Sequence, residues 1–164
     1  ATYTSASGIN NLGDVVGSYG SGAQSFAFEF SGGQYTSLGG APGAVSTIPA
    51  GINNAGTVVG RYFTQNFDSQ GFILNGGQFT TVNYPGALNT QLNGINNAGL
   101  IAGSWSDAAG GGGGFIYKDG EFRDVVLPNT TAEGVSGING RGDIAGGFVN
   151  TSGEAEEYLG LACH

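Results

Sequence analysis

The sequence predicts an all-β protein, a four-bladed β-propeller built from four-stranded repeats of 43 residues. The first observation is that strand-type alternation runs through the chain, with no sustained helical spacing of apolar residues. The second is a regular series of turn signals, which divides each repeat into four short strands. The third is a twelve-residue motif that recurs at a constant spacing of 43 residues: GINNLGDVVGSY at 8–19, GINNAGTVVGRY at 51–62, GINNAGLIAGSW at 94–105 and GINGRGDIAGGF at 137–148.

The first two strands of each repeat flank the Asn-rich part of the motif. The first strand is rich in small residues, as in 4–8, which suits an innermost strand crowded around the propeller axis. The second strand begins apolar on both faces, as in Val15 and Val16, and such a strand is expected to be covered on both faces. We therefore expect the motif isoleucines to occupy equivalent buried positions: Ile9, Ile52, Ile95 and Ile138.

The third and fourth strands of each repeat form a hairpin. A loop of variable sequence leads to the third strand, FAFEF in the first repeat, and Gly32-Gly33 then turns the chain into QYTSL. Glycine tolerates positive φ and so favours tight hairpin turns. A proline follows the fourth strand at the same phase in three repeats, at Pro42, Pro85 and Pro128. Because proline lacks an N–H donor, it ends strand pairing and marks the crossover to the next sheet.

The whole chain, 1–164, is predicted to be a single repeat domain. Its blades are expected at 1–43, 44–86, 87–129 and 130–164, and the last has sequence for only three strands, the third around 157–161. Since one meander cannot bury its apolar faces alone, we expect the four sheets to form a closed ring, with no helix longer than one turn. A repeat sandwich and a β-solenoid are the alternative architectures.

The repeated pattern resembles the HAF-type extracellular repeat of bacterial surface and secreted proteins. It reads G-I-N-N-x-G-x-V-V-G, followed by Gly/Ala-Phe, Gly-x-Phe and Pro-Gly-Ala, and the resemblance covers essentially the whole chain. It implies export and a repeat β architecture, but no established chemistry. The family's His-Ala-Phe or His-Gly-Phe has lost its histidine here, so a role for that histidine does not carry over. In its place stand Phe26-Ala27-Phe28, Gln70-Gly71-Phe72 and Gly113-Gly114-Phe115.

Composition narrows the partners and the location of the protein. Four Lys and Arg against twelve Asp and Glu give a net charge of −8, which argues against nucleic acid and anionic membranes as partners. No apolar run is long enough to insert into a bilayer. The start ATYTSAS is typical either of the interior of a longer chain or of a mature N-terminus left by cleavage. With the lack of Met, the composition resembles that of secreted bacterial proteins, so we expect an extracellular or cell-surface location on a bacterium. The Asn129 and Asn150 sequons matter only in a eukaryotic secretory pathway.

Catalytic and metal-binding motifs are scarce. The only histidine is His164, which argues against a Ser-His-Asp or Cys-His site within the fold. Glu154, Glu156 and Glu157 are neighbours in sequence and are more typical of a solvated turn than of a glycosidase pair. The glycine run at 110–114 has no following Lys-Ser/Thr, which indicates a flexible loop and not a phosphate-binding loop. We predict no enzymatic activity, no cofactor and no metal site.

One aromatic residue per repeat lies eleven residues after the first glycine of the motif, just before the variable loop. Such a set could stack on sugar rings, which would make the protein a carbohydrate-binding propeller lectin with a glycan ligand. The alternative, which we favour, is that each ring packs against a neighbouring blade. These candidate ligand-binding residues are Tyr19, Tyr62, Trp105 and Phe148.

The incomplete fourth blade leaves an open sheet edge. Unpaired N–H and C=O groups on such an edge recruit strands from other chains. We therefore predict an exported, non-enzymatic structural protein that self-associates into an oligomer or filament by strand addition. Cys163 would lie beside the edge and could lock the contact by an intermolecular disulfide. The alternative is a chain that continues past His164 and completes its own blade. The predicted edge comprises Tyr158, Leu159, Gly160, Leu161 and Cys163.

Overall fold

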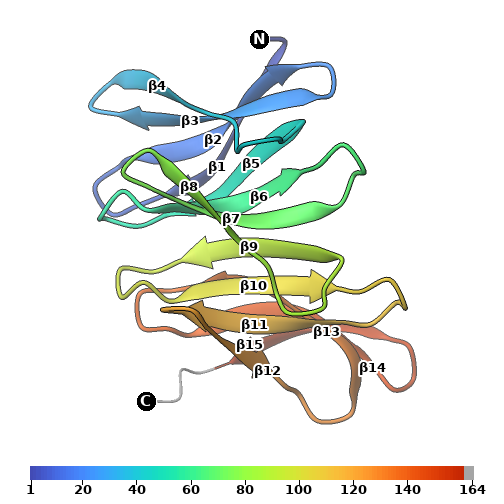
Figure 1. Cartoon of the computed structure of the whole chain (residues 1–164). Helices are drawn as coiled ribbons and strands as arrows, with labels where there is room; N and C mark the ends of the chain where they lie inside the picture. The colour runs from blue at the N-terminus through green and yellow to red at the C-terminus, as the bar shows by residue number, and fades with distance from the viewer. Residues whose placement is uncertain (161–164) are drawn as a thin grey trace.

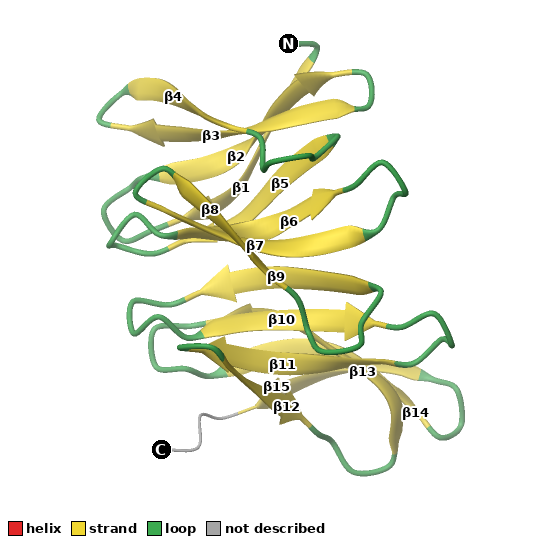
Figure 2. Cartoon of the chain, in the orientation of Figure 1, coloured by secondary structure: helices red, strands yellow, loops and turns green. Residues whose placement is uncertain are grey.

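The computed structural model describes residues 1–160, and for 131–133 only the backbone. This part of the chain forms fifteen β-strands and no helix, which confirms the predicted all-β class (Figure 2). Accordingly, no helix that could cross a membrane occurs in the described range.

The strands form four antiparallel meanders stacked one after another along the molecule (Figure 1). The first sheet contains β1 (Tyr3–Ile9), β2 (Val15–Ser21), β3 (Gln24–Ser31) and β4 (Gln34–Gly39). The second contains β5 (Ser46–Ile52), β6 (Val58–Phe63), β7 (Ser69–Asn75) and β8 (Gln78–Val82). The third contains β9 (Asn89–Ile95), β10 (Ile101–Ser106), β11 (Gly112–Lys118) and β12 (Glu121–Val125). The fourth contains β13 (Thr130–Ile138), β14 (Ile144–Asn150) and β15 (Ala155–Gly160). A single parallel bridge, Ser25 to Ser46, connects the first sheet to the second.

The first strands of the four sheets, β1, β5, β9 and β13, lie next to one another in succession. The first glycine of each motif allows this close approach. A Cβ atom on Gly8 would lie 2.9 Å from the Cα atom of Gly51, and a Cβ atom on Gly51 would lie 3.3 Å from the Cα atom of Gly94. The small residues of the first strands therefore allow neighbouring strands to approach closely.

The stack is open in the described part of the chain, and the predicted ring closure is not seen. The first and fourth sheets lie at opposite ends of the molecule, with two sheets between them (Figure 1). Each of the two middle sheets is therefore covered on both faces, whereas within residues 1–160 each end sheet is covered by another sheet on one face only.

Each sheet has two different faces, and the contact between sheets always pairs unlike faces. In the second sheet, Phe72 and Tyr62 face the first sheet and pack with Val16 of β2. On its other face, Val59 packs with Phe115 and other apolar residues of the third sheet. We call the face that bears Phe72 or its counterpart the aromatic face, and the opposite one the aliphatic face. The aromatic face of one sheet thus packs on the aliphatic face of the preceding sheet.

This rule corrects the expectation that all four motif isoleucines are buried. Ile52 is buried in the first inter-sheet core, and Ile95 packs against the second. Ile9 is 69% exposed, because it lies on the aromatic face of the first sheet, which no other described sheet covers. The sequence motif is the same in each repeat, but burial depends on the position of the sheet in the stack.

A glycine in the second strand of a repeat leaves room for an aromatic ring from the paired strand. Gly60 pairs with Phe72, and a Cβ atom on Gly60 would lie 2.9 Å from the Phe72 ring. Gly103 and Phe115 repeat the arrangement, with 2.4 Å to the ring. Glycine inside a strand marks such a close approach.

The hairpins confirm the turn prediction, but the glycine run is not a loop throughout. Gly32 and Gly33 both have positive φ, as a type I′ turn requires. In contrast to the expected flexible loop, Gly112–Gly114 begin β11 and pair with β10. A Cβ atom on Gly113 would lie 2.9 Å from Nε1 of Trp105, so the run lets the indole lie against the strand.

Candidate functional site

The repeated asparagine of the motif builds the turn between the first two strands. In the second repeat, Oδ1 of Asn53 accepts hydrogen bonds from the backbone N–H groups of Ala55 and Thr57, each 3.0 Å long. Gly56 completes the turn at a φ of 75°. This side-chain turn geometry explains the spacing of Asn and Gly. The other three repeats make the same pair of bonds at Asn10, Asn96 and Asn139.

The same asparagines also join successive sheets. Nδ2 of Asn10 donates to the carbonyl oxygen of Asn53 at 3.2 Å, and Asn53 donates in the same way to Asn96 at 3.4 Å. Asn96 continues the series to Asn139 at 3.2 Å. We call this series of amide contacts the asparagine ladder. Asn10, Asn53 and Asn96 are buried, whereas Asn139 at the end of the series is exposed.

Asn10 has a further role, because its Nδ2 also donates to Asp14 at 2.8 Å. Hydrogen bonds from Ser31 and from Asn10 lower the pKa of the Asp14 carboxyl group below its ordinary value. These hydrogen bonds from Ser31 and Asn10 to the partly exposed carboxylate help to fix the turn.

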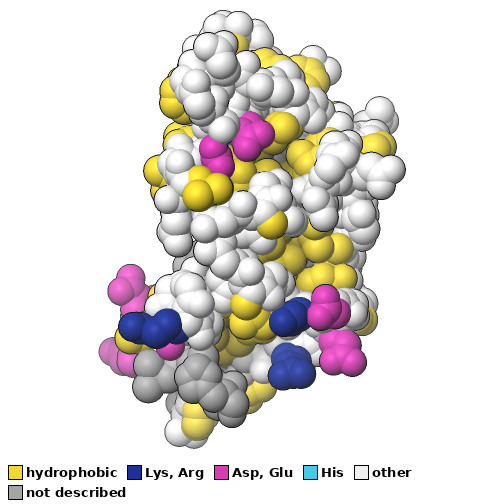
Figure 3. All heavy atoms as spheres, turned by 90° about the vertical axis from the view of Figure 1, so that its left-hand side faces the viewer, with side chains coloured by type: hydrophobic (Ala, Val, Ile, Leu, Met, Phe, Trp, Pro, Cys, Tyr) yellow, Lys and Arg dark blue, Asp and Glu magenta, His cyan; other side chains and the backbone are white. Residues whose placement is uncertain are grey.

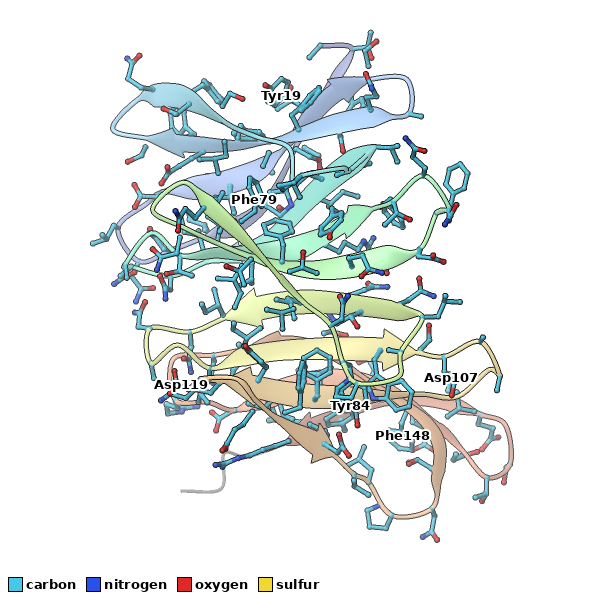
Figure 4. All side chains as sticks on the ribbon, viewed as in Figure 1. Tyr19, Phe79, Tyr84, Asp107, Asp119 and Phe148 are labelled. Atoms are coloured by element: carbon cyan, nitrogen blue, oxygen red, sulfur yellow. The ribbon has the colours of Figure 1, made fainter. Side chains whose placement is uncertain are left out.

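The four predicted aromatic residues do not share one surface. All are partly buried, and they lie on four different sheets, with Tyr19 and Phe148 at opposite ends of the stack (Figure 4). The Tyr62 hydroxyl is 2.9 Å from Oγ1 of Thr81, and the Trp105 ring stacks on Tyr84 at 4.6 Å between centroids. Each ring thus has its own packing partners. This arrangement supports the packing interpretation over a shared sugar platform.

Tyr84 closes the outer side of the contact between the second and third sheets. Its hydroxyl donates a 2.8 Å hydrogen bond to Asp124, which raises the pKa of Tyr84 above its ordinary value, with burial contributing to the shift. Tyr84 also contacts Phe115 and Phe122. The site is therefore an aromatic cluster fixed by a carboxylate.

We expect Trp105→Ala to lower the free energy of unfolding by about 2–4 kcal/mol, because it removes the ring that stacks on Tyr84. Tyr19→Ala, on the outward face of the first sheet, is the comparison variant and should cost less. Urea denaturation measures both. A Trp105→Ala protein of unchanged stability that loses binding on a glycan array would contradict the packing interpretation and support the lectin.

The predicted assembly edge is placed in part. β15 pairs with β14 and has no second strand partner among residues 1–160, whereas β3, β7 and β11 each have two antiparallel neighbours. Tyr158 pairs with Gly146, as Phe115 pairs with Gly103 in the preceding sheet. Leu159 is 71% exposed. Leu161 and Cys163 of the predicted edge lie outside the described residues.

A groove of about 490 Å³ runs along the inner strands of the stack. It is lined by residues from all four sheets, including Ser7, Arg61, Asn93 and Ser136. Sequence reasoning missed this groove, although one signal was present. At the position after the glycine of the second strand (Gly17, Gly60, Gly103 and Gly146), the repeats have Ser18, Arg61, Ser104 and Gly147, so a single repeat carries a charge there.

No grouping of three or more His, Cys, Asp or Glu side chains that could hold a metal occurs within the described range.

Comparison with known proteins provides information on the fold of this chain and none on its function. No protein-family model and no curated protein matches the chain. The crystal structure of TolB from Acinetobacter baumannii is similar, with a TM-score of 0.71 and 11% sequence identity over 96% of this chain. The match covers 40% of that TolB chain, so this protein spans about two fifths of its length. The similarity supports a β-rich architecture and carries no function across.

Proposed function

We propose that this chain is a non-enzymatic assembly module, which self-associates head to tail into larger β-structures at the bacterial surface or outside the cell. In this proposal the four sheets are propeller-type blades. Each further copy of the chain adds its own four sheets to one end of the stack. The extracellular location rests on the composition and on the resemblance to HAF-type repeats.

The observation that carries the proposal is the aromatic face of the first sheet. In the second sheet this face is buried, with Ile52 and Phe79 in the inter-sheet core. In the first sheet the counterparts Ile9 and Tyr35 are 69% and 71% exposed. The same face of the repeat is therefore packed in the second sheet and exposed in the first. An exposed apolar face of this kind can serve as a contact surface.

The opposite end of the stack offers the matching surface. Leu159 pairs with Ala145 as Ile73 pairs with Val59, which places Leu159 on the aliphatic face of the fourth sheet. Within the molecule, aliphatic faces receive aromatic faces. A second copy can therefore continue the stacking by placing its aromatic face against Leu159. Such a heterologous contact closes a ring or grows a filament, depending on the rotation between copies.

The asparagine ladder is compatible with the same contact. The amide of Asn139 donates to Asp143 at 2.8 Å, and Asn10 makes the same kind of bond while also donating to Asn53. In the assembled form, Asn139 of one copy would donate to the Asn10 carbonyl of the next. The β15 edge lies at this end and would receive a strand in the way that sheets add strands in recognition.

Light scattering over a range of protein concentrations tests the assembly. We expect a mass that rises with concentration, and we expect Tyr35→Glu and Leu159→Glu each to prevent growth by placing a charge in the contact. A mixture of the two variants should still form dimers, because each retains one intact end, whereas the double variant should remain monomeric. Val126→Glu is the matched control, since Val126 is 77% exposed and lies outside both end faces.

A peptide with the sequence of 77–82 tests the contribution of the β15 edge. If strand addition takes part, the peptide should bind and limit the mass of the assembly. A wild-type chain that stays monomeric at high concentration and ignores the peptide would overturn the proposed function. A mixture of the two charge variants that forms no dimer would overturn the head-to-tail geometry.

A further inference from the structure

Arg61 is exceptional among the few basic residues of this chain. The other three, Lys118, Arg123 and Arg141, belong to the third and fourth sheets, and Arg141 makes an ion pair of 3.0 Å with Asp143. On the face seen in Figure 3, basic side chains gather beside acidic ones toward the C-terminal end of the stack. Arg61 instead lies on β6 and lines the inner groove.

None of the described contacts of Arg61 is to a carboxylate, so its positive charge has no described counter-charge. Its Nη1 atom donates to Oε1 of Gln91, and its guanidinium carbon lies 5.5 Å from the centre of the Phe63 ring. Its Nε atom is buried and has no hydrogen-bond partner within residues 1–160. No described Asp or Glu side chain lies within ion-pair distance of it, the side chain of Glu133 being outside the described part.

An unmatched guanidinium in a partly buried position opposes folding, because the cation loses water without gaining a counter-charge. The counterpart positions in the other repeats avoid this cost with Ser18, Ser104 and Gly147. The packing of the sheets therefore does not require a cation at this position. A bound anion would supply the missing partner.

We propose that the inner groove binds a small polar ligand through a carboxylate group, which Arg61 recognises. A carboxylate accepts two parallel N–H bonds from a guanidinium, which suits its planar fork. The amide nitrogen of Gln91 adds a donor beside it, because Oε1 of Gln91 already accepts from Arg61. A doubly charged phosphate fits less well in a chain whose net charge is −8.

The rest of the groove suits hydroxyl or amide groups on the same ligand. Ser7 donates a 2.6 Å hydrogen bond to the Pro49 carbonyl, which leaves its oxygen able to accept. Asn93 donates through Nδ2 to Ser104 and to Val135, which leaves its Oδ1 as an acceptor. The exposed Ser136 adds a hydroxyl from the fourth sheet. A sugar acid and an N-acylated amino acid both present a carboxylate with such neighbours.

The test follows the Nε–H signals of the three arginines by ¹H–¹⁵N NMR in the wild-type chain. Sodium galacturonate and N-acetylalanine are the carboxylate probes, galactose and N-acetylalanine amide are their neutral counterparts, and inorganic phosphate is the third arm. We expect a saturable shift of the Arg61 signal with a carboxylate probe and none with its neutral counterpart. The probe that saturates at the lower concentration identifies the source of the carboxylate.

Variants then assign the effect to one residue. Arg61→Gln should weaken binding at least roughly tenfold, because a charge-assisted bidentate contact is lost, and Arg61→Lys should weaken it less. Arg123→Gln, on β12, removes an equal charge outside the groove and should leave binding unchanged. The carboxylate probe should also raise the melting temperature of the wild type but not of Arg61→Gln.

Three results would overturn the proposal. These are no saturable shift at Arg61, equal shifts of all three arginines, and tighter binding of phosphate than of either carboxylate. The wild-type titration decides the question even if a variant fails to fold. The result is independent of the assembly proposal, since the groove residues lie on neither end face.

Discussion

Gly60→Val will lower the free energy of unfolding by about 3 kcal/mol or more. A Cβ atom at this position would lie 2.3 Å from the carbonyl oxygen of Ile48 and 2.9 Å from the ring of Phe72. The first of these is a backbone atom of the paired inner strand, so a side-chain rotation cannot relieve the overlap. Either β5 must move away from β6 or the first inter-sheet core must open.

Urea denaturation followed by circular dichroism measures this effect. Gly137→Val is the matched control, because a Cβ atom on Gly137 meets nothing within 4 Å and this glycine also lies in a strand. The control should change stability by a small fraction of the Gly60→Val effect. Equal denaturation midpoints for the two variants would show that the strand glycines are not packing sites.

Asn53→Ala is expected to cost about 3 kcal/mol of unfolding free energy. The substitution removes two hydrogen bonds that close the turn and the buried bond that Nδ2 donates to the Asn96 carbonyl. It also leaves buried backbone groups without a partner, which costs more than the loss of an exposed bond. The expected result is a clear fall in the midpoint of urea denaturation.

Asn139→Ala separates the contribution of the turn from that of the ladder. Asn139 makes the same two turn bonds but is exposed at the end of the series. We therefore expect a cost of about 1 kcal/mol, since solvent can replace the lost bonds. If both variants lose the same free energy, the ladder contributes nothing and the asparagine serves the turn alone.

Much of the local structure could be predicted from single repeats. Gly32-Gly33 predicted its hairpin because two consecutive positive φ angles demand residues without a Cβ atom. Gly60 lies inside a strand, where the absence of a Cβ atom leaves room for the ring of Phe72. Gly112–Gly114 were misread as a loop, because the indole of Trp105, which needs that open strand surface, belongs to another strand.

The asparagine ladder and the groove beside Arg61 differ in how far the sequence could indicate them. The constant Asn of the motif was visible, but its bond to the next repeat depends on a distance between sheets that only the stacking sets. Arg61 was also visible as the one charged residue among its counterparts. Its position beside a groove, and the lack of a described carboxylate partner there, depend on which side chains the other sheets place near it.

The sequence by itself determined the repeat, the strands and the turns, because these depend on contacts between residues a few positions apart. Only the tertiary structure decided which copy of a repeated residue is buried. Ile9 and Ile52 share the same motif, yet one is 69% exposed and the other 4%, since burial depends on whether another sheet lies against that face. The open stack, with its two unlike end faces, likewise follows from the rotation between successive sheets, which no residue within a single repeat specifies.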